Sequence, residues 1–246
     1  IKAVYDQKDQ ANLTPEQNKL LEKVYNSFVR SGANLEGEAK EQYRTLSKEL
    51  SLLTLQFGEN NLKETNDYKL VLTDPAQLAG LPQSAIDAAA ETAKEKGVEG
   101  WVFTLQAPSY SPFMTYASNR DLRCKLYMAY NTKCTHDNET NNLEIVKKLV
   151  NTRLAIAQLL GYSSFAEYNL QERMAENSGN VYKLLDQLLD AYTPTAKQEY
   201  AEVEALARQL EGSDFTVMPW DWSYYSHKLK DQKFQIDDEM LRPYFE

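Results

Sequence analysis

Only two histidines occur in this chain of 246 residues, His136 and His227, and they lie far apart in the sequence. A hydrolytic zinc site on one helix needs His-Glu-x-x-His, because that spacing turns two imidazoles toward one metal ion and lets the glutamate activate a water. The motif does not occur here. We expect His136 to be a solvated loop histidine and His227 to be packed or on the surface. The sequence therefore offers no catalytic and no metal-binding residue.

Other reactive motifs are also missing. There is no G-x-S-x-G nucleophile turn, no G-x-G-x-x-G and no phosphate-binding P-loop. Cys124 and Cys134 are too few for a disulfide scaffold and have the wrong spacing for a zinc ribbon. We expect two unpaired or buried thiols. The net charge of −9 argues against nucleic acid as a partner, because a phosphate-binding face needs clustered Lys and Arg.

Aromatic residues are the remaining candidates for binding. The chain has 16 Tyr, 8 Phe and 3 Trp, and several of them follow one another near its end. Side chains of this kind suit a wall that holds peptide backbone and side chains, although ordinary helix packing is the alternative. Asp221 lies among them and is expected to be a helix N-cap or first-turn acid rather than a catalytic acid. The candidate wall residues are Trp220, Asp221, Tyr224 and Tyr225.

Helices dominate the elements that must position these residues. Thr14 and Gln17 form a capping box around Pro15, which predicts a helix that runs to Arg30. Residues 38–64 carry apolar residues at steps of three and four, which predicts a long amphipathic helix. No apolar run reaches the roughly 18 residues that cross a bilayer, so no membrane partner is expected.

A small sheet is expected in the first half of the chain. Residues 67–74 and 100–108 are rich in β-forming residues and predict two strands. The Ala-rich residues 84–93 predict a helix between them, which ends at Gly97. Residues 108–113 (PSYSPF) are expected to form a loop.

The second half is expected to be helical. Residues 118–131 and 143–160 predict helices, and Ser164 with Glu167 forms a capping box for another. Residues 178–210 stay helical for so long that Thr193-Pro194 predicts a kink or a break. For the helix at 143–160 we expect one buried apolar face, made of Leu143, Val146, Val150, Leu154 and Ala157.

The fold class is therefore mostly α with a small β element. The best boundary is the polar loop at residues 132–142, which divides the chain into a helical region with a two-strand sheet (residues 1–131) and a second helical region (residues 132–246). No internal period of 20 to 50 residues is present, so a solenoid of stacked repeats is not expected.

The most distinctive segment of the chain is the helix, LLGY turn and helix around LLGYSSFAEYNLQERMA (Leu159–Ala175). Together with other segments, in order from about Leu13 to Glu246, it resembles the thimet oligopeptidase and peptidyl-dipeptidase family of zinc metallopeptidases. Within this family, the sequence most resembles bacterial peptidyl-dipeptidases, also called dipeptidyl carboxypeptidases. The other matching segments are TLSKELSLLTLQFGENNLKETN (45–66), LAGLP (78–82), FTLQAPSYSP (103–112) and MPWDWSYYSHKLKDQKFQIDDEMLRPYFE (218–246).

The resemblance implies the multi-helix half of an ellipsoidal enzyme with a deep channel, in which zinc and a water activated by the motif glutamate hydrolyse peptides. Short peptides would be the substrates, and this branch would release dipeptides from free C-termini. The family's zinc ligands follow the Tyr-Phe pair that matches Tyr244-Phe245, so none can be carried over to a residue of this sequence. The chain is therefore expected to be an inactive fragment that contributes channel wall, with the catalytic half of the same protein as its partner. Cytoplasm is the expected location, with periplasm open.

Two other interpretations stay open. The chain could be a stand-alone peptide-binding module that has lost catalysis, or a helical structural domain without a ligand. A fragment of an enzyme is expected to expose apolar surface and to self-associate. A monodisperse monomer that binds peptides would favour the module.

Overall fold

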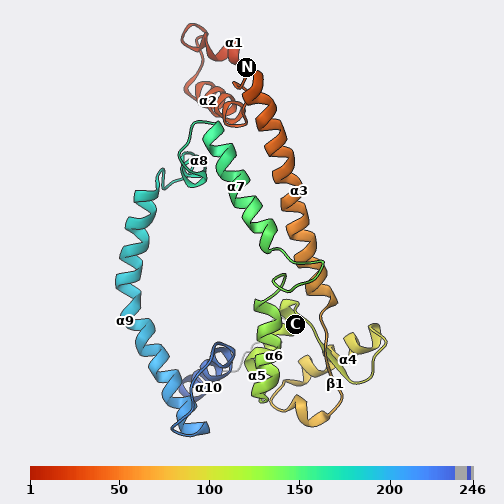
Figure 1. The fold of residues 1–246 in the computed structure, drawn as a ribbon. Coiled ribbons are helices and arrows are strands. Elements are labelled where there is room, and N and C mark those ends of the chain that lie inside the picture. The colour runs from red at the N-terminus through yellow and green to blue at the C-terminus, as the bar shows by residue number, and fades with distance from the viewer. Residues whose placement is uncertain (236–242, 245–246) are drawn as a thin grey trace. The chain divides into compact units, whose positions relative to one another are not determined.

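The computed structural model describes residues 1–235 and 243–244, and it consists mainly of helices with one two-stranded sheet (Figure 1). The predicted fold class, mostly α with a small β element, is confirmed. No helix in the described part of the chain is both long and apolar enough to cross a membrane. The matching segment at residues 218–246 lies partly outside the described residues.

The chain forms two compact units, each built from two stretches of sequence. The first comprises residues 1–57 and 144–183, and the second comprises residues 58–143 and 184–246. The predicted boundary between residues 131 and 132 falls within the second unit, and the division stays a prediction.

The first unit is helical. It contains α1 (Lys2–Tyr5), a short 3-10 helix η1 (Lys8–Gln10), α2 (Pro15–Arg30), the beginning of α3 (Gly37–Asp67), nearly all of α7 (Leu143–Leu159), α8 (Phe165–Leu170) and the start of α9 (Ser178–Glu211). The capping box of α2 is confirmed, and at α8 the Ser164 cap is confirmed while the Glu167 carboxylate accepts the Ser163 N–H at 3.3 Å instead of the Ser164 N–H. Gln17 N–H donates to Thr14 Oγ1 at 3.2 Å, and Glu167 N–H donates to Ser164 Oγ at 3.1 Å.

The predicted apolar face of α7 is wrong for four of its five residues. Leu143, Val146, Val150 and Leu154 are exposed, and only Ala157 is buried. The helix has a second apolar stripe, and Ile145, Leu149 and Ile156 from that stripe are buried instead. Leu50 and Leu53 of α3 pack against Ile145 and Leu149. Periodicity offered two stripes, and only tertiary packing could select between them.

The second unit holds the sheet. It contains the end of α3, β1 (Leu70–Leu72), the 3-10 helix η2 (Pro75–Leu78), α4 (Gln83–Glu95), β2 (Trp101–Phe103), α5 (Ala107–Tyr116), α6 (Arg120–Asn131), most of α9, the 3-10 helix η3 (Pro219–Asp221) and α10 (Trp222–Phe234). The strands are antiparallel, with Leu70 opposite Phe103 and Leu72 opposite Trp101. Both strands are shorter than predicted. Gly100 has φ +92 and passes so close to Leu72 that a Cβ there would meet the Leu72 carbonyl oxygen at 2.1 Å.

One predicted loop is wrong, and one of two expectations at a proline does not occur. Residues 108–113 form part of α5 rather than a loop, and Pro112 lies inside that helix. The missing backbone hydrogen bond is offset because Phe113 and Met114 are buried in the core of the unit. Of the kink or break predicted at Thr193-Pro194, the break does not occur, since α9 runs as one helix from Ser178 to Glu211. A kink there stays a prediction.

The main core of the second unit lies among the sheet, α4, α5 and α6. Phe103 and Phe113 meet there edge to face, with ring centroids 4.6 Å apart. A smaller core packs the end of α9 against α10, and it contains Val203, Ala207, Tyr224 and Tyr225. Between these two cores lies the polar cluster described next.

Candidate functional site

Asp221 is the buried polar centre of the second unit. It is the last residue of η3 and has no exposed surface. It occupies the predicted N-cap position of α10, yet its carboxylate makes no capping bond to that helix. Oδ2 instead accepts a hydrogen bond at 3.0 Å from the Met218 N–H at the start of η3. Its other partners come from a different part of the sequence.

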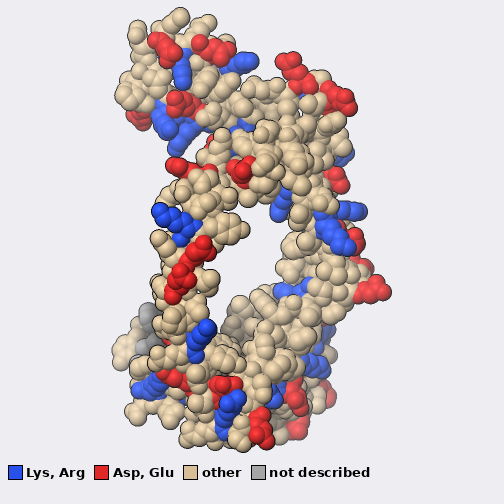
Figure 2. Space-filling model, turned by 60° about the vertical axis from the view of Figure 1, so that its left-hand side comes forward, with Lys and Arg blue, Asp and Glu red and all other residues tan. Residues whose placement is uncertain are grey.

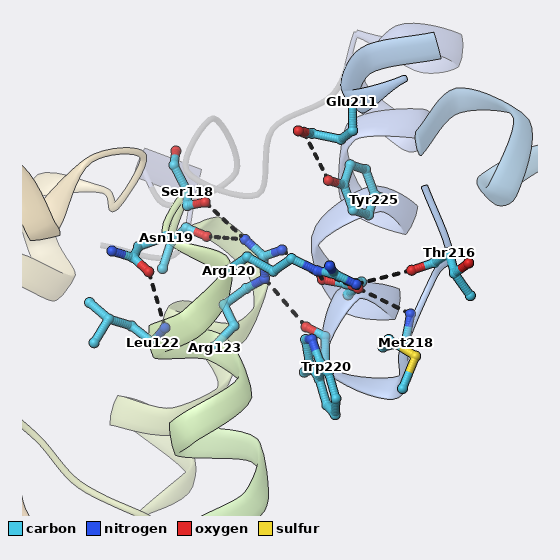
Figure 3. Close-up of polar contacts among 12 residues, drawn as sticks. Ser118, Asn119, Arg120, Leu122, Arg123, Glu211, Thr216, Met218, Trp220 and Tyr225 are labelled. Atoms are coloured by element: carbon cyan, nitrogen blue, oxygen red, sulfur yellow. Dashed lines mark hydrogen bonds and ion pairs between the residues drawn. The ribbon is translucent and has the colours of Figure 1, made fainter. Parts of the chain in front are cut away.

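Those partners are two arginines at the start of α6. Asn119 caps this helix by accepting the Leu122 N–H at 3.1 Å, which fixes where the helix begins. Arg120 and Arg123 are three positions apart and therefore project from the same side of the first turn. Figure 3 shows both side chains leaving this end of α6 and reaching the segment that carries Thr216, Met218 and Trp220.

The two arginines contact both carboxylate oxygens of Asp221. Arg123 Nη2 lies 2.9 Å from Oδ1 and Arg120 Nη2 lies 2.7 Å from Oδ2. Arg120 Nε adds contacts of 3.1 and 3.0 Å to the same two oxygens. Arg120 also donates to the Thr216 carbonyl at 3.0 Å. With the Met218 N–H included, the carboxylate is enclosed by donors.

Arg123 is held more firmly than Arg120. Its side chain is 1 % exposed, against 40 % for Arg120. Its remaining donors reach backbone carbonyls, with Nη1 to Ala117 at 2.7 Å and to Ser118 at 3.2 Å, and Nε to Trp220 at 3.3 Å. Four donor contacts therefore fix the guanidinium plane, which a lysine could not reproduce.

The charges in this cluster are stabilised by one another. Burial by itself raises the pKa of Asp221, but the hydrogen bonds from Arg120, Met218 N–H and Arg123 outweigh it and lower the pKa below its ordinary value. The bond to Asp221 likewise raises the pKa of Arg120. The cluster therefore carries two positive charges and one negative charge. The partly exposed guanidinium of Arg120 brings part of the excess positive charge into contact with solvent.

Aromatic rings enclose the charged groups. The guanidinium of Arg123 lies over the Tyr224 ring at 4.1 Å from its centroid, and that of Arg120 lies over Phe215 at 4.4 Å. Tyr225 meets Tyr224 edge to face and donates its hydroxyl to Glu211 Oε1 at 2.9 Å. Burial, followed by the bond to Glu211, raises the pKa of the Tyr225 phenol well above its ordinary range.

The structure brings all four predicted wall residues to this cluster. Asp221, Tyr224 and Tyr225 are buried, and Trp220 is partly buried and packs edge to face against Tyr127. Sequence reasoning missed Arg120 and Arg123. Their spacing on one helix face was visible in the sequence, but their common partner lies about a hundred residues away. Whether any of the four residues lines a channel stays a prediction.

The two histidines are not brought together. His136 is exposed, with Nε2 3.7 Å from Glu64 Oε1. His227 is largely buried against the Tyr116 ring, with Nε2 3.1 Å from Asp231 Oδ2. Among residues 1–235 and 243–244, no group of three or more His, Cys, Asp or Glu side chains could hold a metal ion. The described residues therefore do not fit a zinc site.

The cluster binds segments of the protein to one another. Both carboxylate oxygens, the Arg123 guanidinium, and Nε and Nη2 of Arg120 are bonded to protein partners, and no nucleophile or free general base lies among them. The arrangement fixes α10 and η3 to α6, so its chemical role is positioning. On the face drawn in Figure 2, basic side chains are scattered among acidic ones, and no basic patch suited to phosphate is visible there.

Comparison with known proteins gives consistent matches. The family described as Peptidase family M3 matches residues 113–246, which include the whole Asp221 cluster. Oligopeptidase A of Haemophilus influenzae is 36 % identical over 233 residues, and dipeptidyl carboxypeptidase of Escherichia coli is 30 % identical over 247 residues. These alignments cover 93 % and 100 % of this chain but 34 % and 36 % of the relatives. The organellar oligopeptidase A of Arabidopsis thaliana is 32 % identical, over 100 % of this chain and 32 % of its own length. The chain thus spans about a third of the curated relatives it matches.

Proposed function

Because the chain belongs to peptidase family M3, we propose that the whole protein is a zinc-dependent peptidase of short peptides and that residues 1–246 are part of its helical scaffold. The family match over residues 113–246 carries the proposal. No step of catalysis is assigned to this segment, because its described residues do not fit a zinc site. Zinc would be bound by residues outside them. Cytoplasmic placement stays a prediction.

We assign to the whole protein the release of dipeptides from free C-termini. The likeness to dipeptidyl carboxypeptidase over 100 % of this chain supports that reaction. The higher identity to oligopeptidase A supports a second candidate, which is cleavage of oligopeptides without a need for a free C-terminus. The two reactions differ in whether the terminal carboxylate is required.

A matched pair of peptides separates them. The complete coding sequence that contains the codons for residues 1–246 is expressed, and its product is incubated with an N-acetylated hexapeptide that has either a free or an amidated C-terminus. We expect dipeptides from the free peptide alone, loss of cleavage with a zinc chelator, and recovery with added zinc. Cleavage of both peptides would favour the oligopeptidase reaction, and no metal-dependent cleavage would refute the peptidase proposal.

The wall role can be tested at Tyr224. Replacing Tyr224 with Phe keeps the ring that the Arg123 guanidinium contacts, so the fold is expected to be retained. If the hydroxyl holds peptide, KM of the whole protein rises several-fold while its unfolding midpoint is unchanged. Unchanged KM would leave Tyr224 as a packing residue. Tyr130→Phe, on α6 away from Asp221, is the matched control.

An exposed apolar face on α9 supports a scaffold that packs against further protein. Leu185, Leu189 and Tyr192 follow helical spacing and are 51 %, 65 % and 65 % exposed. Contiguous apolar patches of this kind mark interaction surfaces. Residues 1–246 alone should therefore self-associate in sedimentation velocity and should not cleave peptide. A monomer that binds peptide would instead favour a non-catalytic peptide-binding module.

A further inference from the structure

A pocket in the second unit, away from Asp221, has the chemistry of an anion site. It lies between α4 and the segment from β2 to the start of α5, and it has a volume of about 420 Å³. This volume falls within the range of small-molecule sites. Its lining includes Lys96, Asn66, Ser109, Phe103 and three alanines of α4.

Lys96 is the only charged residue in this lining. The chain as a whole has a net charge of −9, so a lining with a cation and no carboxylate departs from its average surface. No ion pair joins Lys96 to another of the described residues. Lys94, two positions earlier, is occupied by Glu91 Oε2 at 2.9 Å. Lys96 is thus the cation on this part of α4 that is available to a ligand.

Neutral donors accompany the cation. Gln106 Nε2 donates to Asn66 Oδ1 at 2.8 Å, which orients Asn66 and leaves its Nδ2 group able to donate. Ser109 Oγ accepts the Thr104 N–H at 2.9 Å, which leaves the serine hydroxyl proton able to donate. Both side chains line the same pocket as Lys96. A ligand that accepts hydrogen bonds and carries negative charge would meet all three groups.

The rest of the lining is apolar and small. Ala85, Ala88 and Ala89 form one wall, and the buried ring of Phe103 lies beneath it. Short side chains at these three positions leave room for a few carbon atoms beside the donors. A bare inorganic anion would make no apolar contact with this wall. An aliphatic carboxylate would contact the donors through its oxygens and the alanine wall through its carbon chain.

We propose that this pocket binds a small aliphatic carboxylate, with Lys96 as its charge partner and the alanine wall of α4 against its carbon chain. Two sources share this chemistry, namely the C-terminal end of a short peptide and a free aliphatic acid. The proposal does not depend on the peptidase activity, because the pocket lies within the described residues of the second unit.

A different role for Lys96 must be separated from binding. Lys96 follows the last turn of α4, where a cation stabilises the negative end of the helix dipole. Lys94 in the last turn contributes in the same way. Replacing either with Gln should therefore lower stability by similar small amounts, and only Lys96→Gln should change ligand binding. Lys94→Gln is the matched control.

The test uses the 246-residue chain labelled with ¹⁵N-alanine, so that the amides of Ala85, Ala88 and Ala89 report on the pocket. It is titrated with butyrate, with N-acetyl-Ala-Ala, with the amide of that peptide and with inorganic phosphate. We expect saturable shifts at the three amides with both carboxylates, and about a tenfold weaker affinity in Lys96→Gln but not in Lys94→Gln. Ala88→Leu, which fills the exposed wall with a good helix former, should abolish the shifts of the Ala85 and Ala89 amides.

The outcomes decide the proposal and the source. Tighter binding of N-acetyl-Ala-Ala than of butyrate would identify a peptide end, and the reverse order would identify a free acid. Equal binding of the peptide amide or of phosphate would overturn the carboxylate assignment. The site would be overturned if Lys96→Gln bound the carboxylates as tightly as the unchanged protein. It would also be overturned if no amide shifted when millimolar ligand was present in 20-fold excess over the protein. None of these results bears on whether the whole protein cleaves peptides.

Discussion

Two carboxylates in the second unit each join segments that are distant in sequence, and they do so with different partners. Asp221 has no exposed surface and is paired with two arginines and one backbone N–H. Glu64, near the end of α3, is 18 % exposed and holds the loop at residues 132–142. It accepts the Cys134 N–H at 2.6 Å and the Thr140 hydroxyl at 3.0 Å.

The difference lies in what each carboxylate leaves behind when it is removed. Without Asp221, the guanidinium of Arg123 stays buried with no counter-charge, and such a group is costly. Without Glu64, the loop loses hydrogen bonds to neutral donors, which water can partly replace at a position that is not fully buried. The two sites look alike as links between segments but should differ several-fold in energy.

Asp221→Ala is expected to have the largest effect. Breaking a buried pair from one side costs about 3–5 kcal/mol, because an uncompensated charge remains. Trp101, Trp220 and Trp222 are the three tryptophans of the chain and all lie in the second unit, so denaturant unfolding followed by tryptophan fluorescence measures this unit. The exposed Asp190→Ala in the same unit is the control and should change stability by less than about 0.5 kcal/mol. Equal effects of the two variants would contradict the pairing.

The two arginines should contribute unequally. Arg123→Met removes a guanidinium that is 1 % exposed and leaves three carbonyl groups without their donor. We expect about 3 kcal/mol of destabilisation. Arg120 is 40 % exposed, and Asp221 would keep Arg123 and Met218 N–H without it, so Arg120→Met should cost about half as much or less. The same fluorescence measurement compares them, and a larger loss at Arg120 would show that the exposed arginine is the principal partner.

Acid should weaken the Asp221 link selectively. The pKa of Asp221 is lowered in the folded protein, so its contribution to stability is complete above the unfolded value of about 3.9 and is lost as the pH falls through the folded value. The unfolding free energy of the second unit should therefore decrease below about pH 4. In Asp221→Asn this part of the decrease should be absent, whereas the exposed control Asp190→Asn should keep it.

The sequence was sufficient for local features of the fold and insufficient for these links. The helix starts at Thr14 and Ser164 depend on hydrogen bonds within four residues, and both were predicted. The choice between two apolar stripes on α7 depends on Leu50 and Leu53 of another helix, and it was predicted wrongly. Pro112 lies inside a helix because the neighbouring Phe113 is buried in the core. Rules based on local sequence cannot predict that burial.

The candidate site follows the same division. Asp221 was recognised as a residue near a helix start, which is a local property. Its arginine partners come from α6, about a hundred residues earlier, and the pattern of the chain does not specify which acid they contact. The carboxylate pocket likewise combines Asn66, Lys96 and Ser109, which share no motif. Long-range pairing of polar residues has to be read from the folded chain.

Glu64→Gln should have a smaller effect than the changes at the Asp221 cluster. Both hydrogen bonds go to Oε2, and the glutamine amide oxygen can still accept both, so the loss is that of the negative charge and we expect about 1 kcal/mol of destabilisation or less. The loss should appear first as faster hydrogen exchange of the Cys134 and Thr140 amides rather than as global unfolding. Exchange that speeds up equally throughout the second unit would mean that Glu64 stabilises the unit as a whole. Its energetic role would then resemble that of Asp221.

The reactivity of the Cys134 thiol tests the smallest effect expected at the Glu64 site. Burial, followed by a hydrogen bond of the thiol itself to Glu64, raises its pKa to about 11. An ordinary thiol titrates near about 8.5, so at pH 8 the thiolate fraction of Cys134 falls by roughly two orders of magnitude. Alkylation of Cys134 in the folded chain, followed by mass spectrometry, should be at least about 100-fold slower than in denaturant. Because burial is the larger cause, Glu64→Gln should accelerate the reaction only a few-fold. Acceleration to the denatured rate would show that Glu64, and not packing around the loop, keeps this residue buried.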